Sequence, residues 1–126
     1  MAIGKFAIKT TKTGVKVVLK ASNGEPILSS EVYTTEKTCR NGIASVKANA
    51  PIAAIEDQTV EGFEKQKHPK FEIYTDKAGE FRFRLKAKNG QNIGHSEGYK
   101  SMKSCRNGIE SVVKNAPEAP IVKVED

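Results

Sequence analysis

The sequence predicts an α+β protein in which two tandem β-β-β-α-β repeats share one antiparallel sheet. The first observation is an internal repeat, since the five residues from Cys39 to Ile43, Cys-Arg-Asn-Gly-Ile, return from Cys105 to Ile109. The second is that each repeat changes from apolar residues at every second position to apolar residues at every third or fourth. The third is length, because 126 residues make one ordinary domain, whereas half of that buries too little surface to be stable alone. We therefore expect both repeats to build one core.

The first repeat is expected to span residues 1–57. Alternating apolar and polar side chains predict three strands, at residues 5–10, 15–21 and 27–32. A helix follows, with Thr35 as its N-cap and its end near Asn49, because Pro51 prevents continuation. Its apolar stripe has helical spacing and consists of Cys39, Ile43, Val46 and Ala50. Residues 52–57 are expected to add a short fourth strand.

Residues 58–70 show no clear period and are expected to form a linker. The second repeat, residues 71–126, has the same order of elements, with strands expected at 71–75, 81–88, 92–99 and 121–124. Ser101 is the expected N-cap of its helix. One helix can cover one face of a small sheet, so we expect both helices on one face and the charged side chains on the other.

Glycine is expected to have two roles. Asn23-Gly24 and Asn89-Gly90 predict type I′ hairpin turns, in which both central residues have positive φ. Gly42 and Gly108 fall inside the helices, where glycine costs about 1 kcal/mol relative to alanine. We expect these two to permit close approach of the sheet or of the other helix, and we prefer this interpretation to a functional hinge.

The charge balance favours contact with a polyanion. The chain has 21 Lys and Arg residues against 15 Asp and Glu, a formal net charge of +6 and a pI of about 9.3. Such a balance is typical of proteins that bind nucleic acid, but a lysine-rich surface that only keeps the protein soluble would give the same numbers.

The two cysteines occupy equivalent positions in the repeats. Two cysteines do not make a disulfide framework, and we expect small buried residues of a reducing compartment. A bridge between the repeats and a reactive thiol are the alternatives. No apolar run is long enough for a transmembrane helix, and the N-terminus lacks the apolar core of a signal peptide. The expected location is the cytoplasm, with no membrane association.

Each repeat resembles the YegP-like family, an uncharacterised bacterial family built from one or two copies of a domain of unknown function. The resemblance rests on the paired Asn-Gly hairpins, on Ser-Glu-x-Tyr at 30–33 and 96–99, and on Asn-Gly-Ile-x-Ser-Val at 41–46 and 107–112. It covers nearly the whole chain apart from the linker. The first repeat departs slightly from the second, since Glu36 stands at the position of Met102 and Val32 at that of Gly98.

The resemblance implies a unit of three strands, a helix and a strand, assembled in pairs into one sheet with the last strands exchanged between units. A tandem chain would then build within one molecule the pseudo-two-fold arrangement that single-copy members would build as dimers. We therefore expect a monomer with internal pseudo-dimer symmetry. The family lends no activity, and the departures of the first repeat put equal function of the two halves in doubt.

No combination of residues in the sequence predicts an enzyme. A Cys–His pair would have to bring His68 or His95 beside a thiol that the helix stripe places in the core. His95, Ser96 and Glu97 are consecutive strand residues, whose alternating directions cannot form a triad. Potential zinc ligands are too few and too widely spaced, and no glycine-rich phosphate loop occurs. We expect no catalytic residues, no metal and no cofactor.

The exposed face of the sheet is the better candidate for function. Strand alternation places on this face cations and one aromatic residue, namely Lys16, Lys20, Tyr74, Arg82, Arg84 and Lys86. Cations beside an aromatic ring are typical of platforms that bind single-stranded nucleic acid. The plainer interpretation is an ordinary solvated face in which Glu72 pairs with Arg84 across two strands. For Ser-Glu-x-Tyr we likewise weigh a pair of polar pockets against a structural tie of the third strand, and favour the tie.

Three hypotheses for function follow. The main one is a small non-enzymatic binding or interaction module of the bacterial cytoplasm, whose partner the sequence does not name. The alternative is a binder of single-stranded RNA or DNA that uses the basic sheet face. A thiol-dependent enzyme is the least favoured of the three.

Overall fold

The computed structural model describes residues 4–124 and contains one sheet, two α-helices and a short 3-10 helix. Helix α1 is Glu36–Asn49, α2 is Met102–Asn115, and η1 is Ala50–Ile52. The strands are β1 (Lys5–Thr10), β2 (Val15–Lys20), β3 (Pro26–Ser29), β4 (Ala54–Asp57), β5 (Lys70–Thr75), β6 (Phe81–Lys86), β7 (Asn92–His95) and β8 (Ile121–Val124). The fold is α+β, as predicted.

The eight strands follow the order β4-β5-β6-β7-β3-β2-β1-β8. Strand β4 follows α1 but pairs with β5, and β8 follows α2 but pairs with β1, and both of these pairings are parallel. The sheet is therefore mixed, and the prediction of an antiparallel sheet is wrong for its two edges. The reason is that a helix or a long loop, and not a hairpin turn, connects each edge strand to the rest of the chain.

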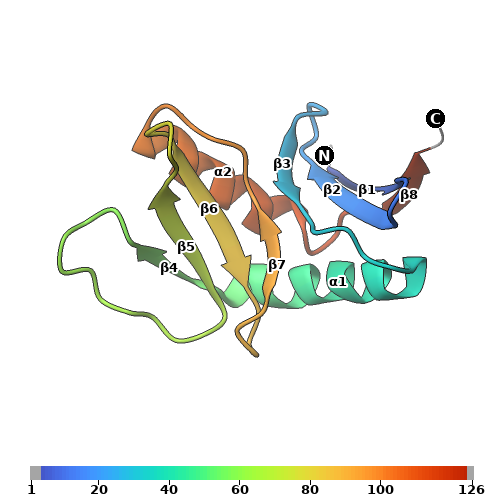
Figure 1. The fold of residues 1–126 in the computed structure, drawn as a ribbon, viewed down its shortest axis with the longest axis horizontal. Coiled ribbons are helices and arrows are strands. Elements are labelled where there is room, and N and C mark those ends of the chain that lie inside the picture. Colours follow the sequence, from blue (N-terminus) through green and yellow to red (C-terminus); the bar gives the residue numbers. More distant parts are fainter. Residues whose placement is uncertain (1–3, 125–126) are drawn as a thin grey trace.

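The sheet divides into two groups of four strands that meet at one bridge. Figure 1 shows β4 to β7 on one side and β3, β2, β1 and β8 on the other. The pairing between β3 and β7 consists of Ser29 opposite His95. The helices connect the two groups, because α1 contacts β2 and β7 whereas α2 contacts β3 and β6.

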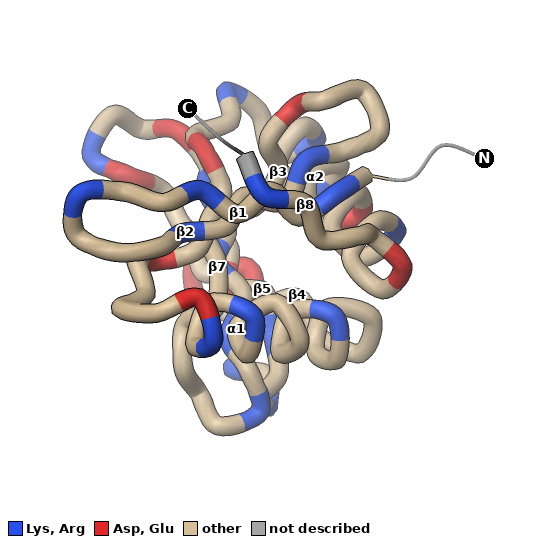
Figure 2. The backbone as a smooth tube through the Cα atoms, turned by 90° about the vertical axis from the view of Figure 1, so that its right-hand side faces the viewer, with Lys and Arg blue, Asp and Glu red and all other residues tan. Residues whose placement is uncertain are grey.

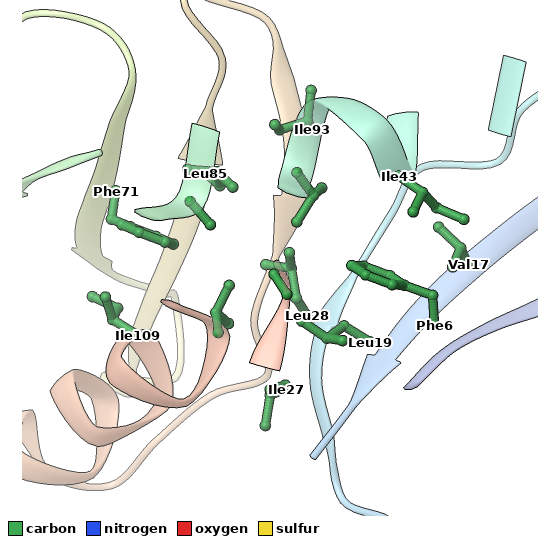
Figure 3. Packing of buried hydrophobic residues seen from close by; sticks show 14 of the residues in the cluster. Phe6, Val17, Leu19, Ile27, Leu28, Ile43, Phe71, Leu85, Ile93 and Ile109 are labelled. Atoms are coloured by element: carbon green, nitrogen blue, oxygen red, sulfur yellow. The ribbon is translucent and has the colours of Figure 1, made fainter. Parts of the chain in front are cut away.

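One hydrophobic cluster contains side chains from both groups of strands and from both helices. We call the face that contributes to it the inner face of the sheet. In Figure 3, Leu28 lies between a group around Phe6 and Ile43 and a group around Phe71 and Ile109. The largest fully buried apolar side chains are Phe6, Leu19, Ile43, Phe71, Ile73, Phe83, Leu85, Ile109 and Val112. Burial of aromatic and aliphatic area on this scale is the dominant favourable term in folding.

Both helices begin where the sequence predicts. The Thr35 hydroxyl accepts a hydrogen bond from the Thr38 backbone N–H, and the Ser101 hydroxyl accepts one from Ser104. Near the end of α1, the Asn49 side-chain amide donates to the backbone oxygen of Ser45 at 2.7 Å. The equivalent asparagine of α2 does the same, so the repeated Ser and Asn have a structural role.

The Asn-Gly hairpins differ from the prediction. Gly24 and Gly90 have positive φ angles of 86° and 84°. Within residues 4–124 no residue other than glycine has a positive φ. A type I′ turn would need positive φ at the asparagines as well. Backbone hydrogen bonds instead join Ala21 to Glu25 and Ala87 to Gln91, so each loop is one residue longer than a two-residue type I′ turn. The register of β2 against β3 shifts accordingly.

The glycines inside the helices each pack against a tyrosine of the same repeat. A Cβ atom on Gly108 would lie 2.5 Å from the Tyr99 hydroxyl and 3.1 Å from the Phe83 ring, which stacks on Tyr99. A Cβ atom on Gly42 would meet the Tyr33 hydroxyl in the same way. The expectation of close approach is correct for the sheet, because Phe83 belongs to β6 and each tyrosine forms a bridge to a strand, and the tyrosine ring is the nearest group. This contact also explains why a tyrosine precedes each Cys-Arg-Asn-Gly-Ile motif.

We predict that Gly108→Ala lowers the free energy of unfolding by about 1 kcal/mol. The clash with Tyr99 should cost about 1–3 kcal/mol, and the better helix propensity of alanine should return about 1 kcal/mol. Urea denaturation of both proteins measures the difference.

The control is Asn107→Ala, since Asn107 is exposed in the same helix and should lose no stability. In a Tyr99→Phe background the cost of Gly108→Ala should shrink. An unchanged cost in that background would show that the hydroxyl contact is not the reason for the glycine.

Candidate nucleic-acid interface

The structure places all six predicted site residues on the outer face, which is the face opposite the core. Cross-strand pairing shows this, because Tyr74 lies opposite Arg82, and Glu72 opposite Arg84. The cross-strand row that contains Arg84 continues through His95 and Ser29 to Val18 on β2. Lys16 and Lys20 lie two residues before and after Val18 and therefore share its face. The six residues nevertheless divide between two different surroundings, one on β5 and β6 and one on β1 and β2.

On β5 and β6 carboxylates neutralise the arginines. Arg84 Nε lies 2.6 Å from Glu72 Oε1, and Arg82 Nε lies 2.6 Å from Asp76 Oδ2. The Arg84 guanidinium also lies over the Tyr74 ring, 4.6 Å from its centre, which is a cation–π distance. Tyr74 therefore already has a partner on this face, and the plainer interpretation of Glu72 and Arg84 is correct.

A buried ion pair completes this half of the outer face. Lys70 Nζ lies 2.8 Å from Glu56 Oε1 and 3.2 Å from Glu72 Oε2. Glu56 is 2% exposed although it lies on the outer face, because the backbone N–H of Gln66 in the connection from β4 to β5 donates to its carboxylate. We call the outer face of β4, β5 and β6 the closed half.

These contacts change the ionisation of Glu56. Burial alone would raise the pKa of this carboxyl, but hydrogen bonds from Lys70, Gln58 and the Gln66 backbone lower it from 4.5 to about 2. Burial would lower the pKa of Lys70, but its bonds to Glu56 and Glu72 raise it. Both groups are therefore charged over the whole neutral range.

On β1 and β2 lysines lie opposite one another on the outer face. Lys5 lies directly opposite Lys20, and Lys9 directly opposite Lys16. Like charges in opposite positions destabilise a sheet. Within residues 4–124, Lys5, Lys16 and Lys20 make no ion pair, and Figure 2 shows basic but no acidic positions along β1, β2 and β8. We call the outer face of β8, β1 and β2 the open half.

The centre of the open half is apolar. Val122, Ala7 and Val18 form the cross-strand row in which the closed half has Glu56, Glu72 and Arg84. The lysines therefore surround a small neutral floor. Sequence reasoning missed Lys5 and Lys9, although their period-two positions on β1, opposite Lys16 and Lys20, are the signal that could have found them.

The two residues Ser and Glu of the Ser-Glu-x-Tyr motif have different roles. The Ser30 hydroxyl accepts a hydrogen bond from the Val17 backbone N–H and donates one to the Glu31 carbonyl, and Ser96 makes the same pair of bonds to Phe83 and Glu97. The serines are thus structural ties, as expected.

Glu31 instead lines an open cavity of about 430 Å³ between the segment after β3 and the hairpin of β6 and β7. The other lining residues are Tyr33, Gln91, Asn92 and Ile93. In the first copy of the motif, Glu31 and Tyr33 thus both border this cavity.

The thiols lie in the core. Cys39 and Cys105 are free and 0% exposed, and burial raises the pKa of both, that of Cys105 to about 11. Such thiols stay protonated at neutral pH and are poor nucleophiles. His95 lies on the outer face, opposite the helices that hold the cysteines. Among residues 4–124 no group of three His, Cys, Asp or Glu side chains could hold a metal ion.

The chain belongs to the family described as a domain of unknown function, DUF1508, whose model matches residues 14–57 and 76–122. The UPF0339 protein YegP of Yersinia pestis is 43% identical over 116 residues, which cover 91% of this chain and 90% of that protein. A UPF0339 protein of Methanosarcina acetivorans is 55% identical over 56 residues, 44% of this chain but 97% of that protein. The family is uncharacterised, so membership assigns no function.

Two solved structures share the fold. The solution structure of yegP from E. coli matches with a TM-score of 0.78 and 35% identity, and the match covers 98% of this chain and 94% of that one. A UPF0339 protein from Shewanella oneidensis matches with a TM-score of 0.79 and 35% identity, over 98% and 92% of the two chains. No helix within residues 4–124 is long and apolar enough to cross a membrane.

We predict that Glu56→Gln lowers the free energy of unfolding at pH 7 by about 3 kcal/mol. A carboxyl with a pKa of 4.5 when unfolded and about 2 when folded stabilises the protein above pH 4.5, and this contribution is lost as the pH falls towards 2. The variant should therefore show a weaker loss of stability between pH 4.5 and 2. Thermal denaturation across this pH range measures both effects.

The matched control is Glu110→Gln, which removes an exposed carboxylate that pairs with Lys114 on α2. Exposed pairs of this kind contribute at most about 1 kcal/mol. If both substitutions gave the same small change, the buried ion pair would not hold the closed half together.

Proposed function

We propose that the protein is a non-enzymatic binding module that holds single-stranded nucleic acid on the open half of its sheet. The observation that carries this proposal is that Lys5 lies directly opposite Lys20 on the outer face and that, within residues 4–124, neither of these lysines nor Lys16 makes an ion pair. An arrangement that costs stability in the free protein is explained by an anionic ligand that neutralises it.

Two further observations favour an extended, flexible polyanion. The four lysines lie on a sheet face, and lysines at positions four apart on one strand are about 13 Å apart. Val18 and Val122, which are partly exposed on either side of the buried Ala7, offer contact to the faces of bases. Single strands combine backbone charge with exposed base faces and fit such surfaces without a specific groove. The predicted site thereby narrows to Lys16 and Lys20 with Lys5 and Lys9, whereas Tyr74, Arg82 and Arg84 have structural partners and Lys86 lies opposite Lys70, whose charge is paired with Glu56 and Glu72.

The absence of an enzymatic role is part of the proposal. It is supported by the buried, protonated thiols and by their separation from His95 across the sheet. A thiol-dependent reaction would need an accessible thiolate beside a base.

We also propose that the chain is a tandem duplication that acts as a monomer with internal pseudo-two-fold symmetry in the bacterial cytoplasm. The family model matches the chain twice, and the Methanosarcina relative corresponds in length to one repeat. The exchange of β4 and β8 between the halves gives one core to both repeats, so neither half needs a second chain to cover it.

We predict that Lys16→Glu with Lys20→Glu weakens the binding of a fluorescein-labelled single-stranded oligonucleotide at least tenfold at about 50 mM salt. Each phosphate contact contributes about −0.7 to the slope of log K against log salt. The slope should be about −2 to −3 for the natural protein and smaller in magnitude by about 1.4 for the variant, because two phosphate contacts are lost. Fluorescence anisotropy at salt concentrations between about 50 and 200 mM measures both quantities.

The control is Lys77→Glu with Lys86→Glu, which has the same net charge but changes the turn before β6 and the closed half. This control should bind almost as well as the natural protein. Equal losses in the two variants would indicate a response to net charge alone. Absence of binding at low salt would exclude nucleic acid as the ligand.

A further inference from the structure

We propose that the cavity beside Glu31 holds one unstacked base of the bound strand and selects adenine or cytosine, which carry an amino group at N6 or N4, over uracil or thymine, which carry a carbonyl oxygen at that position. We call the cavity lined by Glu31, Tyr33, Gln91, Asn92 and Ile93 the slot. The inference rests on the proposed function and adds to it a specificity for the base.

The slot exists because β3 and β7 separate beyond their single bridge. Ser29 lies opposite His95, but the segment after β3 turns towards β2, where Tyr33 forms a bridge with Val15. On the other side, Asn92 and Gly94 continue the pairing of β7 with β6. The slot is therefore built into the topology, between two halves of the sheet that are connected at one point.

The size and lining of the slot suit a nucleobase. A cavity of about 430 Å³ lies within the range of small-ligand sites. Tyr33 and Ile93 supply an aromatic and an apolar surface, and single-stranded bases bind proteins by packing on such surfaces while polar groups contact their edges. The amide oxygen of Asn92 accepts the Gly94 backbone N–H at 3.0 Å, so its NH₂ group remains as the donor.

Glu31 determines which edge of a base the slot accepts. Within residues 4–124 its carboxylate makes no hydrogen bond or ion pair, and an ionised carboxylate only accepts hydrogen bonds. It can accept from the amino group of cytosine or adenine. Thymine and uracil present a carbonyl oxygen at the same position, which a carboxylate repels. The Asn92 amide donor can then contact a ring nitrogen or carbonyl of the accepted base.

The slot adjoins the lysines of the open half. Val15 pairs with Tyr33, which places Lys16, the next residue on β2, beside Glu31 and Val32. Burial lowers the pKa of His95, and Lys16 lowers it further while Glu31 raises it, in keeping with the place of both side chains near His95 on the outer face. A strand whose phosphates lie on the open half can therefore turn one base into the slot.

The second copy of the motif provides a matched control. Glu97 and Tyr99 correspond to Glu31 and Tyr33, but Glu97 does not line the slot. Glu25 corresponds in the repeat to Gln91 of the slot, and burial above all, followed by the charges of Cys105, Glu97 and Glu25, raises the pKa of Tyr99. The two copies of the motif therefore differ in charge, and only the first is expected to select a base.

The experiment measures the affinities of oligo(dA), oligo(dC) and oligo(dT) of one length for the natural protein, Glu31→Ala and Glu97→Ala. The natural protein should bind oligo(dA) and oligo(dC) about tenfold more tightly than oligo(dT), the size expected of one hydrogen bond to a charged group. Glu31→Ala should abolish this ratio, whereas Glu97→Ala should retain it. Lys5→Glu with Lys20→Glu, at the ends of β1 and β2 away from Glu31, should weaken all three oligonucleotides and leave the ratio unchanged.

Equal binding of the three oligonucleotides, or a ratio that survives Glu31→Ala, would overturn the slot and leave the proposed function intact. A second arm follows backbone amide NMR signals with adenosine, cytidine and uridine monophosphates, which do not require the lysines. Shifts at Tyr33, Asn92 and Ile93 with the first two nucleotides alone would support the slot even if no oligonucleotide bound. Absence of such shifts, or equal shifts with uridine monophosphate, would contradict it.

Discussion

The buried ion pair of Glu56 and Lys70 is the interaction on which the difference between the two halves of the sheet depends. Parallel neighbours such as β4 and β5 require a crossover of a dozen or more residues, and residues 58–69 provide it. The Gln66 backbone in this crossover binds Glu56, and Glu72 and Arg84 complete the network. The arginines of the closed half therefore stabilise the protein, whereas Lys5, Lys16 and Lys20 of the open half make no ion pair within residues 4–124.

The exchanged edge strands also differ in charge. Oδ2 of Asp57, at the end of β4, lies 3.3 Å from Nη2 of Arg106 in α2. Nζ of Lys123, in β8, lies 2.7 Å from Oε1 of Glu36 in α1. Each of these ion pairs joins an edge strand to a helix of the other half of the chain. Exposed ion pairs of this kind add little stability.

Much of the fold could be predicted from the sequence because local chemistry determines it. The caps Thr35 and Ser101 and the apolar stripes mark both helices, and period-two alternation marks β1, β2, β5 and β6. The parallel edges could not be read, because alternation does not reveal the direction of a neighbouring strand. The turn type at Gly24 was missed because Asn-Gly also suits a longer loop in which glycine alone has positive φ.

The candidate site was predicted by face but not by partner. Alternation placed Arg82 and Arg84 outward, yet only the fold shows Asp76 and Glu72 within ion-pair distance. The slot depends on the separation of β3 from β7, which no local pattern encodes.

The most direct test of the account is a map of backbone amide shifts in ¹H–¹⁵N NMR spectra as a single-stranded oligo(dA) is added. The account predicts that the largest changes occur in β1, β2 and the segment from Glu31 to Tyr33, with β5, β6 and the exposed faces of the helices little affected. Largest changes on β5 and β6, or on the helices, would contradict the assignment of binding to the open half.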